Sequence, residues 1–478
     1  MNLMTTPTIW ILFPLLLSIL LIAIHRLHKL SIWLACLGSL LLAVAAFIFP
    51  QNLDFSLGGR NFLFDDTFLI LNRSLTLTGS QLRTVAMLYL FSFLWNIAGL
   101  RFSVSRWFPS ISLAITALWV STLAVDPFLY AALIVELIVL ISVLLLTPRG
   151  EQTGSGVMRY LVSQTIAMPF ILLSGWMVAG IESAPSASTL ILRGAVLILI
   201  GFALWLAIFP LHSWMPMLAE KSHPWVFSFI FLMQQTSLSI FLLKVLDQFA
   251  WLRNLAGVFP ALQWAGVLTL LAGGVLASLQ TKVNRILAYM IMIETGYSVL
   301  AIGLIGQGGG EAFALSLLPR ALAYWQWSYT LSSIQQIEPE IDGSFTSLQG
   351  LFARLPIHST SLIISLLGLL GLPALGLFPA KRMLWNSGAG LTFHYTPLLG
   401  LAVAGMALFI IRLIHTLLTT NLQSPSHALP TKREESVWQI FVLCFVTLLS
   451  LLFGIFPHIF LNPFLGLLET FIHLLPPS

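Results

Sequence analysis

Residues 128–147 read FLYAALIVELIVLISVLLLT, an apolar run whose one charged side chain is Glu136. A helix of about 20 such residues, rising about 1.5 Å per residue, spans the roughly 30 Å hydrocarbon layer of a membrane. The rest of the chain is similar, because 58% of its 478 residues are hydrophobic and only 8% are charged. A soluble domain carries about 25% charged residues. The composition therefore excludes a soluble globular fold and predicts an all-α polytopic membrane protein.

The sequence offers about fourteen apolar runs that are long enough to span a membrane. The first run has no Lys or Arg before it and no small-residue cleavage site after it, so we interpret it as a retained helix rather than a signal peptide. The runs lie near 8–24, 32–50, 78–100, 109–125, 128–147, 158–181, 188–209, 225–246, 259–280, 286–305, 312–333, 358–378, 395–418 and 437–456.

Basic residues in the connecting loops gather on one side when the loops are counted alternately. Short loops rich in Lys and Arg lie on the cytoplasmic side, so we expect both termini outside and the first connection inside. The net charge of +5 is then explained by the orientation of the loops in the membrane, and it gives no support to nucleic-acid binding. The basic residues of the inner side are Arg26, Lys29, Arg101, Arg106, Arg149, Arg159, Lys221, Lys282, Arg285, Arg354, Lys432 and Arg433.

The chain offers no residues for a cofactor or a metal. Cys36 and Cys444 lie alone in apolar runs and cannot by themselves build an iron–sulfur, zinc or haem site. The glycines at 308–310 lack the Lys-Ser/Thr of a phosphate-binding loop, and no nucleophile elbow occurs. We therefore expect no bound cofactor, and any electron carriers must belong to another chain.

Proline and glycine interrupt two of the apolar runs at corresponding places. Matched interruptions indicate an internal repeat with discontinuous helices, because unwound backbone at membrane depth must be buried or line a wet cavity. The alternative is that Pro and Gly are simply commoner in membrane helices. The interruptions are Pro210 and Pro216 in the seventh run, and Gly368, Gly371, Pro373, Gly376 and Pro379 in the twelfth.

Ionisable residues at membrane depth are functional candidates because a charge there is costly. Glu136 lies too far from either end of its run to reach water, which suits a proton relay. The alternative is a protonated Glu that makes one interhelical hydrogen bond. Lys381, beside Arg382, follows the second interruption and either relays protons or places its charge at the membrane surface.

Three further residues are weaker candidates. His212 follows the first interruption and either bridges a water chain or caps a helix end. Glu294 and Arg320 lie inside apolar runs, and the sequence does not assign their partners.

Three segments together resemble the antiporter-like, proton-translocating membrane subunits of respiratory complex I, membrane-bound hydrogenases and multisubunit sodium/proton antiporters. The segments are IFPLHSWMP at 208–216, ASLQTKVNRILAY at 277–289 and GLPALGLFPAK at 371–381. Glu136 adds a fourth match, since it falls where the family has a glutamate in its fifth helix.

The resemblance implies two inverted five-helix repeats with broken helices 7 and 12. It implies a proton relay along a central polar axis that includes Glu136 and Lys381. The hypothesis of proton conduction adds Glu294 and His212 to this relay. The implied division is 1–108 for helices 1–3, 109–250 for the first repeat, 251–420 for the second repeat, and 421–478 for the C-terminal loop, helix 14 and an amphipathic tail.

Several positions depart from the family pattern. Trp205 occupies the place of the seventh-helix lysine whose charge would let Glu136 ionise. Arg320 and Tyr324 stand where the eleventh helix usually carries a His and a Lys. We therefore expect a partly degenerate axis. Polar side chains that replace the Lys or His of the eighth helix are Gln234, Gln235, Thr236 and Ser237.

The sequence leaves three functions open. The first is a proton-conducting subunit of a larger complex, a translocase without a redox centre of its own. The second is a non-conducting structural membrane subunit, and the third is the membrane half of an inorganic-carbon uptake system. The first implies other membrane subunits, soluble redox subunits and an energy-coupling membrane such as the bacterial inner membrane.

Overall fold

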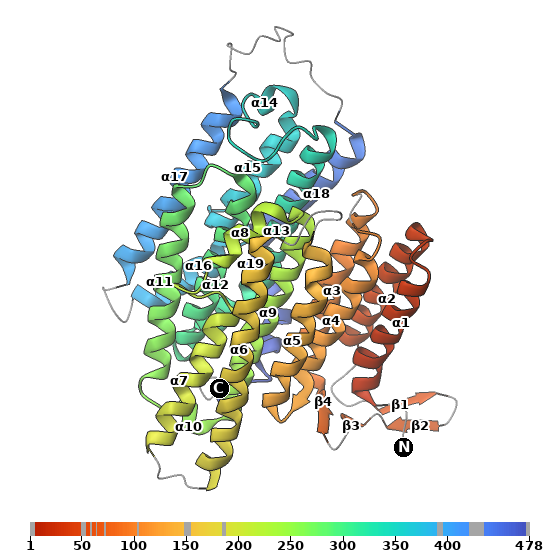
Figure 1. Ribbon diagram of the computed structural model, residues 1–478, viewed down its shortest axis with the longest axis vertical. Helices are drawn as coiled ribbons and strands as arrows, with labels where there is room; N and C mark the ends of the chain where they lie inside the picture. Colours follow the sequence, from red (N-terminus) through yellow and green to blue (C-terminus); the bar gives the residue numbers. More distant parts are fainter. Residues whose placement is uncertain are drawn as a thin grey trace. The chain divides into compact units, whose positions relative to one another are not determined.

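Helices make up most of the described part of the chain (Figure 1). The computed structural model describes residues 5–48, 54–57, 60–63, 65–70, 73–102, 105–147, 154–183, 188–389, 395–419 and 435–474. Of the basic residues that predict the orientation, Arg149, Lys432 and Arg433 lie outside these ranges. Every apolar run predicted from the sequence coincides with a helix, so the helical class is confirmed.

The chain forms two compact units, which we call unit 1 and unit 2. Unit 1 comprises Met1–Leu206, Phe229–Val258 and Gly466–Ser478, and unit 2 comprises Ala207–Ser228 and Phe259–Leu465. The expected division at residues 108, 250 and 420 stays a prediction.

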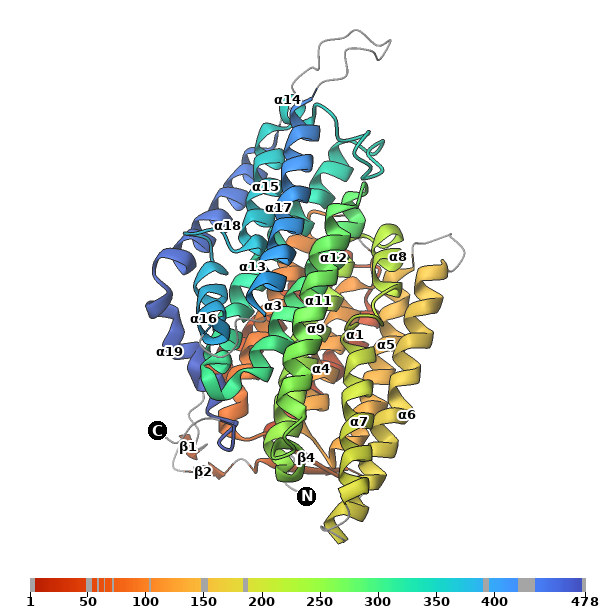
Figure 2. The ribbon, with the colours of Figure 1, turned by 90° about the vertical axis from the view of Figure 1, so that its left-hand side faces the viewer.

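Unit 1 contains helices from the first half of the chain. Within it, α5, α6 and α7 run side by side (Figure 2). The helices are α1 (Phe13–Ala23), preceded by a π-helical turn at Thr8–Leu12, α2 (His28–Ile48), α3 (Leu82–Gly99), α4 (Phe108–Ala124), α5 (Ala131–Leu146), α6 (Ser155–Ser183), α7 (Ser188–Trp205), most of α9 (Pro224–Gln248) and α10 (Ala250–Arg253).

Short strands accompany these helices, and the sequence analysis did not predict them. β1 (Asp54–Leu57) pairs with β2 (Arg60–Leu63) in register Asp54 to Leu63. The antiparallel sheet β3-β4-β5 joins β3 (Thr67–Ile70), β4 (Arg73–Thr76) and β5 (Val125–Asp126). Strands of two to four residues carry too little alternation of apolar and polar side chains to be recognised.

Unit 2 contains the later helices, among which α13 contacts α12, α15 and α16. Its elements are α8 (Trp214–Lys221), α11 (Val258–Ser278), α12 (Val283–Gly303), α13 (Gly309–Ile337), α14 (Leu351–Arg354), α15 (Pro356–Leu370), α16 (Phe378–Ala389), α17 (Thr396–Leu418), α18 (Val437–Ile455) and most of α19 (Pro457–Leu468).

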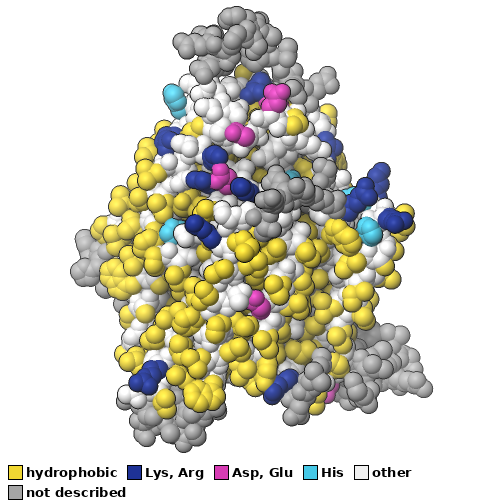
Figure 3. All heavy atoms as spheres, viewed as in Figure 1, with side chains coloured by type: hydrophobic (Ala, Val, Ile, Leu, Met, Phe, Trp, Pro, Cys, Tyr) yellow, Lys and Arg dark blue, Asp and Glu magenta, His cyan; other side chains and the backbone are white. Residues whose placement is uncertain are grey.

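The surface has the composition of a membrane protein. Hydrophobic side chains cover much of the face drawn in Figure 3, and large apolar residues such as Trp176 and Leu144 are 72% and 67% exposed. A soluble monomer rarely exposes large contiguous apolar patches. In the described residues, nine helices are long and apolar enough to cross a membrane, and four shorter apolar helices accompany them. The membrane class is confirmed, whereas the count of about fourteen spans and the inverted repeats stay predictions.

Both predicted interruptions are breaks in helices. α7 ends at Trp205 and α8 begins at Trp214, while α15 ends at Leu370 and α16 begins at Phe378. In the second break, Gly371 and Ala374 have φ angles of 86° and 73°. This left-handed backbone cannot continue a right-handed helix.

Partners from other helices satisfy amide groups that the breaks free. Phe209 N–H donates to Thr269 Oγ1 at 3.2 Å in the first break, and Gly376 N–H donates to Ser450 Oγ at 3.3 Å in the second. Such bonds are required because buried backbone groups must be paired.

Candidate functional site

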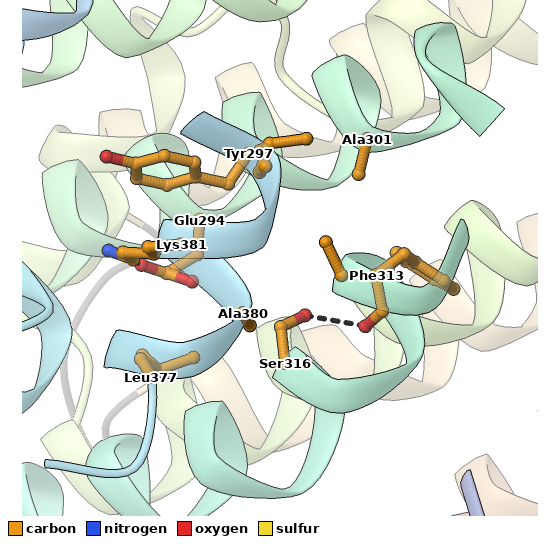
Figure 4. A pocket seen from close by; sticks show the side chains of 10 residues that line it. Glu294, Tyr297, Ala301, Phe313, Ser316, Leu377, Ala380 and Lys381 are labelled. Carbon is orange, nitrogen blue, oxygen red and sulfur yellow. Dashed lines mark hydrogen bonds and ion pairs between the residues drawn. The ribbon is translucent and has the colours of Figure 1, made fainter. Parts of the chain in front are cut away.

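The second break positions a buried ion pair in unit 2. Lys381 lies in the first turn of α16, and its Nζ is 2.7 Å from Glu294 Oε1 on α12. The side chains of Lys381 and Glu294 are only 12% and 2% exposed. Figure 4 shows the ammonium and the carboxylate facing each other beneath the ring of Tyr297.

Two further contacts hold the Lys381 ammonium. It donates to the carbonyl oxygen of Leu369, in the last turn of α15, where the helix dipole is negative. It also lies 4.1 Å from the centre of the Tyr297 ring, within the range of a cation–π interaction. The break thus places a carboxylate, a helix end and a ring face around one lysine.

Arg320 brings a second cation to the same region. It is fully buried on α13, and its Nη1 donates to Ser298 Oγ at 2.7 Å, one turn after Glu294 on α12. Its Nη2 donates to Ser316 Oγ at 2.9 Å. Arg320 interacts electrostatically with both Glu294 and Lys381. The group therefore contains two cations and one anion.

The balance of two cations and one anion determines which of these side chains can change its protonation state. Arginine stays protonated in proteins, whereas a lysine can release its proton when it is desolvated. If Lys381 releases a proton, the Arg320 cation remains to balance the Glu294 anion. The arrangement therefore supports a lysine that changes its charge state without leaving a carboxylate unpaired.

A small cavity adjoins the ion pair and has room for about one water molecule. Its volume is about 10 Å³, and it lies between Glu294 and Lys381 on one side and Ser316 on the other. The Ser316 hydroxyl donates to the Phe313 carbonyl oxygen at 2.7 Å (Figure 4). A water molecule there can pass a proton between polar groups that do not touch.

Unit 1 holds Glu136 in a different setting. Glu136 is half-buried on α5, and its Oε1 accepts a hydrogen bond from Thr165 Oγ1 on α6 at 2.7 Å. In the described residues, Glu136 is paired with this neutral hydroxyl and with no Lys or Arg. The loss of the seventh-helix lysine as a partner of Glu136 stays a prediction.

A neutral amide network occupies the expected lysine position. Trp205 is 1% exposed, and its carbonyl oxygen accepts from Gln234 Nε2 at 2.7 Å. The same nitrogen donates to Gln164 Oε1 at 3.1 Å. Gln164 is a residue that the sequence analysis missed, since a lone Gln in an apolar run carries no specific signal.

The structure thus brings together only some of the predicted site residues. Glu294, Lys381 and Arg320 form one group, and Tyr324 follows Arg320 by one turn of α13. Gln235 and Ser237 are buried on α9, at 3% and 0% exposure. His212 lies in the first break, where its ring stacks on Phe209 with the ring centres 5.6 Å apart. In the described residues, no contact joins it to the group of Lys381.

The segment 277–289, one of the three that carry the family resemblance, contacts α8. Its Lys282 Nζ lies 2.6 Å from Glu220 Oε1, and its Arg285 Nη2 lies 2.5 Å from Glu220 Oε2. Burial raises the pKa of Glu220, but Lys282 and Arg285 lower it more, so this pKa lies below its usual range. These residues tie the loop before α12 to α8.

No set of three or more His, Cys, Asp or Glu side chains suited to a metal ion occurs in the described ranges. The expectation of no metal and no cofactor stays a prediction.

Buried charges at a helix break, inside a polytopic helical protein, are a feature typical of membrane transport proteins. Residues 128–408 match the family described as NADH:quinone oxidoreductase/Mrp antiporter, TM. This match covers more than half of the chain, so the chain belongs to that family.

Curated relatives match over part of their length. NADH-quinone oxidoreductase subunit N of Shewanella woodyi is 26% identical over 324 residues, which are 63% of this chain and 66% of that protein. The chloroplastic NAD(P)H-quinone oxidoreductase subunit 5 of Carpenteria californica is 28% identical over 232 residues, 47% of this chain and 30% of that protein. The match therefore spans less than two thirds of these relatives.

Solved structures match over nearly the whole chain. A chain of the archaeal membrane-bound sulfane sulfur reductase superposes with a TM-score of 0.81 at 17% identity, covering 98% of both chains. A chain of the Mrp complex from Dietzia sp. superposes with a TM-score of 0.80 at 16% identity, covering 99% of this chain and 98% of that one. A chain of respiratory complex I from Thermus thermophilus superposes with a TM-score of 0.72 at 20% identity, covering 97% of this chain and 99% of that one. At these identities the likeness shows the fold alone.

Proposed function

We propose that this chain is a proton-conducting membrane subunit of a multisubunit complex, with Lys381, Glu294 and Arg320 as its relay. The observation that carries the proposal is the buried ion pair between Lys381 and Glu294 at the α15–α16 break. Charges are costly at membrane depth, and those that persist there generally serve transport. The family membership supports the same function.

The relay works through the charge of Lys381. In the resting state the Lys381 ammonium pairs with Glu294. Loss of its proton to the adjoining cavity breaks one N–H bond and leaves a neutral amine, while Arg320 balances Glu294. A proton arriving from the opposite direction restores the ammonium. Each cycle moves one proton past the pair.

We extend the proposal to the arrangement of the chain in its membrane and to its partners. We place the breaks in inverted repeats, at helices 7 and 12 of about fourteen spans, in an energy-coupling membrane with both termini outside. The partners are other membrane subunits and soluble redox subunits. Two solved structures with this fold support a place in a larger complex, because one is described as a respiratory membrane complex and the other as an Mrp complex.

A second candidate is a structural subunit that conducts nothing. The feature that favours it is Trp205, whose buried indole and neutral amide partner stand in place of a lysine. A neutral network cannot alternate its charge as a relay does. This candidate predicts that substitutions in the Lys381 group change assembly or stability but leave proton movement unaffected.

The direct test is Glu294→Gln in the intact complex, reconstituted into vesicles. The amide keeps the shape of the side chain but cannot hold the negative charge. Proton movement is expected to fall about tenfold or more, since a positioned acid or base contributes at least that much. Glu311→Gln is the matched control, because Glu311 is an exposed carboxylate in the first turn of α13.

The readouts are proton movement and the subunits that co-purify in mild detergent. Loss of movement in Glu294→Gln with normal assembly and normal movement in Glu311→Gln supports conduction. Unchanged proton movement in Glu294→Gln contradicts it and favours the structural candidate.

A further inference from the structure

Exposed cations lie at one end of the first helices of unit 1. Arg26 lies in the turn between α1 and α2, Lys29 lies in the first turn of α2, and Arg106 lies in the connection between α3 and α4. The alternation of basic loops predicts that this is the inner end. Figure 3 shows Lys and Arg side chains gathered with His over this end of α1 and α2.

Aromatic stacking joins the two connections that carry these cations. The His25 ring stacks on the Trp107 ring, with the ring centres 4.6 Å apart and the ring planes 13° apart. Arg26 follows His25 directly and Arg106 precedes Trp107 directly, so the stack brings the two arginines to one place. We call Arg26, Lys29 and Arg106 the basic cluster.

Within the described residues, no carboxylate pairs with the basic cluster. The sequence explains this, because residues 1–53 and 67–125 contain no Asp or Glu. In unit 2 the cations Lys282 and Arg285 differ, since both pair with Glu220. The positive-inside rule explains why cations lie at the inner end, but not why they lack carboxylate partners. The basic cluster therefore carries an uncompensated charge that favours an anionic partner.

An apolar face of α2 begins at the basic cluster. Trp33 follows Lys29 by four residues, which places both side chains on one face of the helix. Trp33, Leu37 and Leu41 continue along α2 at the same spacing, and each is more than half exposed. The face thus passes from exposed cations to exposed apolar side chains over several turns. A phospholipid has the same order, since its charged headgroup is followed by apolar chains.

The aromatic pair indicates the depth of the basic cluster in the membrane. Trp side chains such as Trp107 are enriched where the hydrocarbon layer meets the headgroups. Phosphate groups lie at that depth, and Arg and Lys bind them with charge-assisted hydrogen bonds. Arginine suits a phosphate especially well, because its planar fork of N–H groups matches two phosphate oxygens.

We propose that the basic cluster and the apolar face of α2 bind an anionic phospholipid. The cluster holds the phosphate headgroup, and Trp33, Leu37 and Leu41 contact an acyl chain. The site does not depend on proton conduction, since a structural subunit presents the same surface. The alternative occupant is a neighbouring membrane subunit with an acidic loop, which would cover α2 and exclude the lipid.

Occupancy is tested by photo-crosslinking of the intact complex in phosphatidylcholine nanodiscs. The probe is a phosphatidylglycerol with a photoactivatable group in its acyl chain, and a phosphatidylcholine with the same chains is the neutral control. Mass spectrometry of peptides locates the modified residues. We expect the anionic probe to modify the face of Trp33, Leu37 and Leu41 at a lower concentration than the neutral probe. Equal modification by both probes, or modification by neither, overturns the proposal.

The role of the cations is tested by combining Arg26→Gln with Arg106→Gln. Each Lys or Arg near a membrane surface contributes about fivefold to the binding of anionic lipid, so the double variant is expected to need about 25-fold more anionic probe. Modification by the neutral probe is expected to stay unchanged, which shows that α2 is still folded and exposed to lipid. Unchanged modification by the anionic probe would overturn the role of the cluster.

Two further double variants separate charge from position. Arg193→Gln with Arg382→Gln removes the same charge from exposed arginines outside the cluster, and modification by the anionic probe is expected to persist. Arg26→Lys with Arg106→Lys keeps both charges in the cluster and is also expected to retain it. Equal losses in the Arg193 and Arg26 pairs of Gln variants would show that only the net charge matters, and would contradict a site at the cluster.

Discussion

At the residue scale, the Lys381–Glu294 pair behaves as one unit. Removing one partner of a buried pair costs about 3–5 kcal/mol, because the other charge is left uncompensated. Single substitutions in this pair therefore disturb both folding and the relay. When Lys381 is neutral, the nearby Arg320 charge reduces the cost of burying the Glu294 carboxylate. For this reason every test at the group needs a measure of assembly beside the transport measurement.

The sequence identified each member of this group but not the group itself. Glu294, Arg320 and Lys381 were each candidates as ionisable residues at membrane depth. They lie on three helices, α12, α13 and α16, and their pairing depends on how those helices pack. One sequence holds no information on such contacts, so the structure was needed to connect them.

Glu136→Gln tests the relay role of Glu136 in unit 1. The amide oxygen can still accept the Thr165 hydrogen bond, so the substitution removes little except the titratable proton. Proton movement in reconstituted vesicles is expected to fall about tenfold or more, with normal co-purification of the other subunits. Unchanged movement would rule out the relay role of Glu136 and agree with the neutral partners at Trp205.

At the element scale, the α15–α16 break is the feature that makes the site. Gly371 starts the break with a left-handed backbone, and an added Cβ would lie 2.8 Å from Lys381 Cδ. On α18, an added Cβ at Gly454 would lie 2.2 Å from the Ala374 carbonyl oxygen. Neighbouring backbone thus fixes the break and, with it, the position of Lys381.

Gly371→Ala is expected to weaken both stability and transport. A left-handed conformation costs a residue with a Cβ about 1–2 kcal/mol, and the new methyl group displaces the Lys381 side chain. Gly368→Ala is the control, because Gly368 lies in the preceding helix and an added Cβ there meets no atom within 4 Å. The measurements are the thermal unfolding midpoint of the complex and its proton movement. Equal behaviour of the two variants would argue against a special role for the break.

Most helices were predictable, and the reasons are physical. Apolar runs of membrane length predict the positions of α7, α9 and α15. The Pro and Gly residues predict the breaks that follow α7 and α15. The strands at 54–76 were missed because they are very short. The link from Glu220 to Lys282 and Arg285 was missed because it joins α8 to the start of α12, two elements far apart in the sequence, although the segment 277–289 includes both basic residues.

At the scale of the whole molecule, the two units differ in their charges. Unit 2 holds a buried pair that includes a lysine, whereas in unit 1 the end of α7 holds Trp205 and the Gln234 amide network. We therefore place the Lys381 relay in unit 2 and keep the relay role of Glu136 in unit 1 as a separate prediction.

The central claim is that Lys381 passes protons through the membrane. The measurement that tests it is proton movement by the intact complex in vesicles, under its own driving reaction, with Lys381→Met compared against Arg382→Met. The neighbouring Arg382 is exposed and serves as the matched cation. We expect Lys381→Met to lose about nine tenths of the proton movement or more, whereas Arg382→Met retains it. Full proton movement in Lys381→Met, with the complex assembled, would show that Lys381 is not needed for proton transfer.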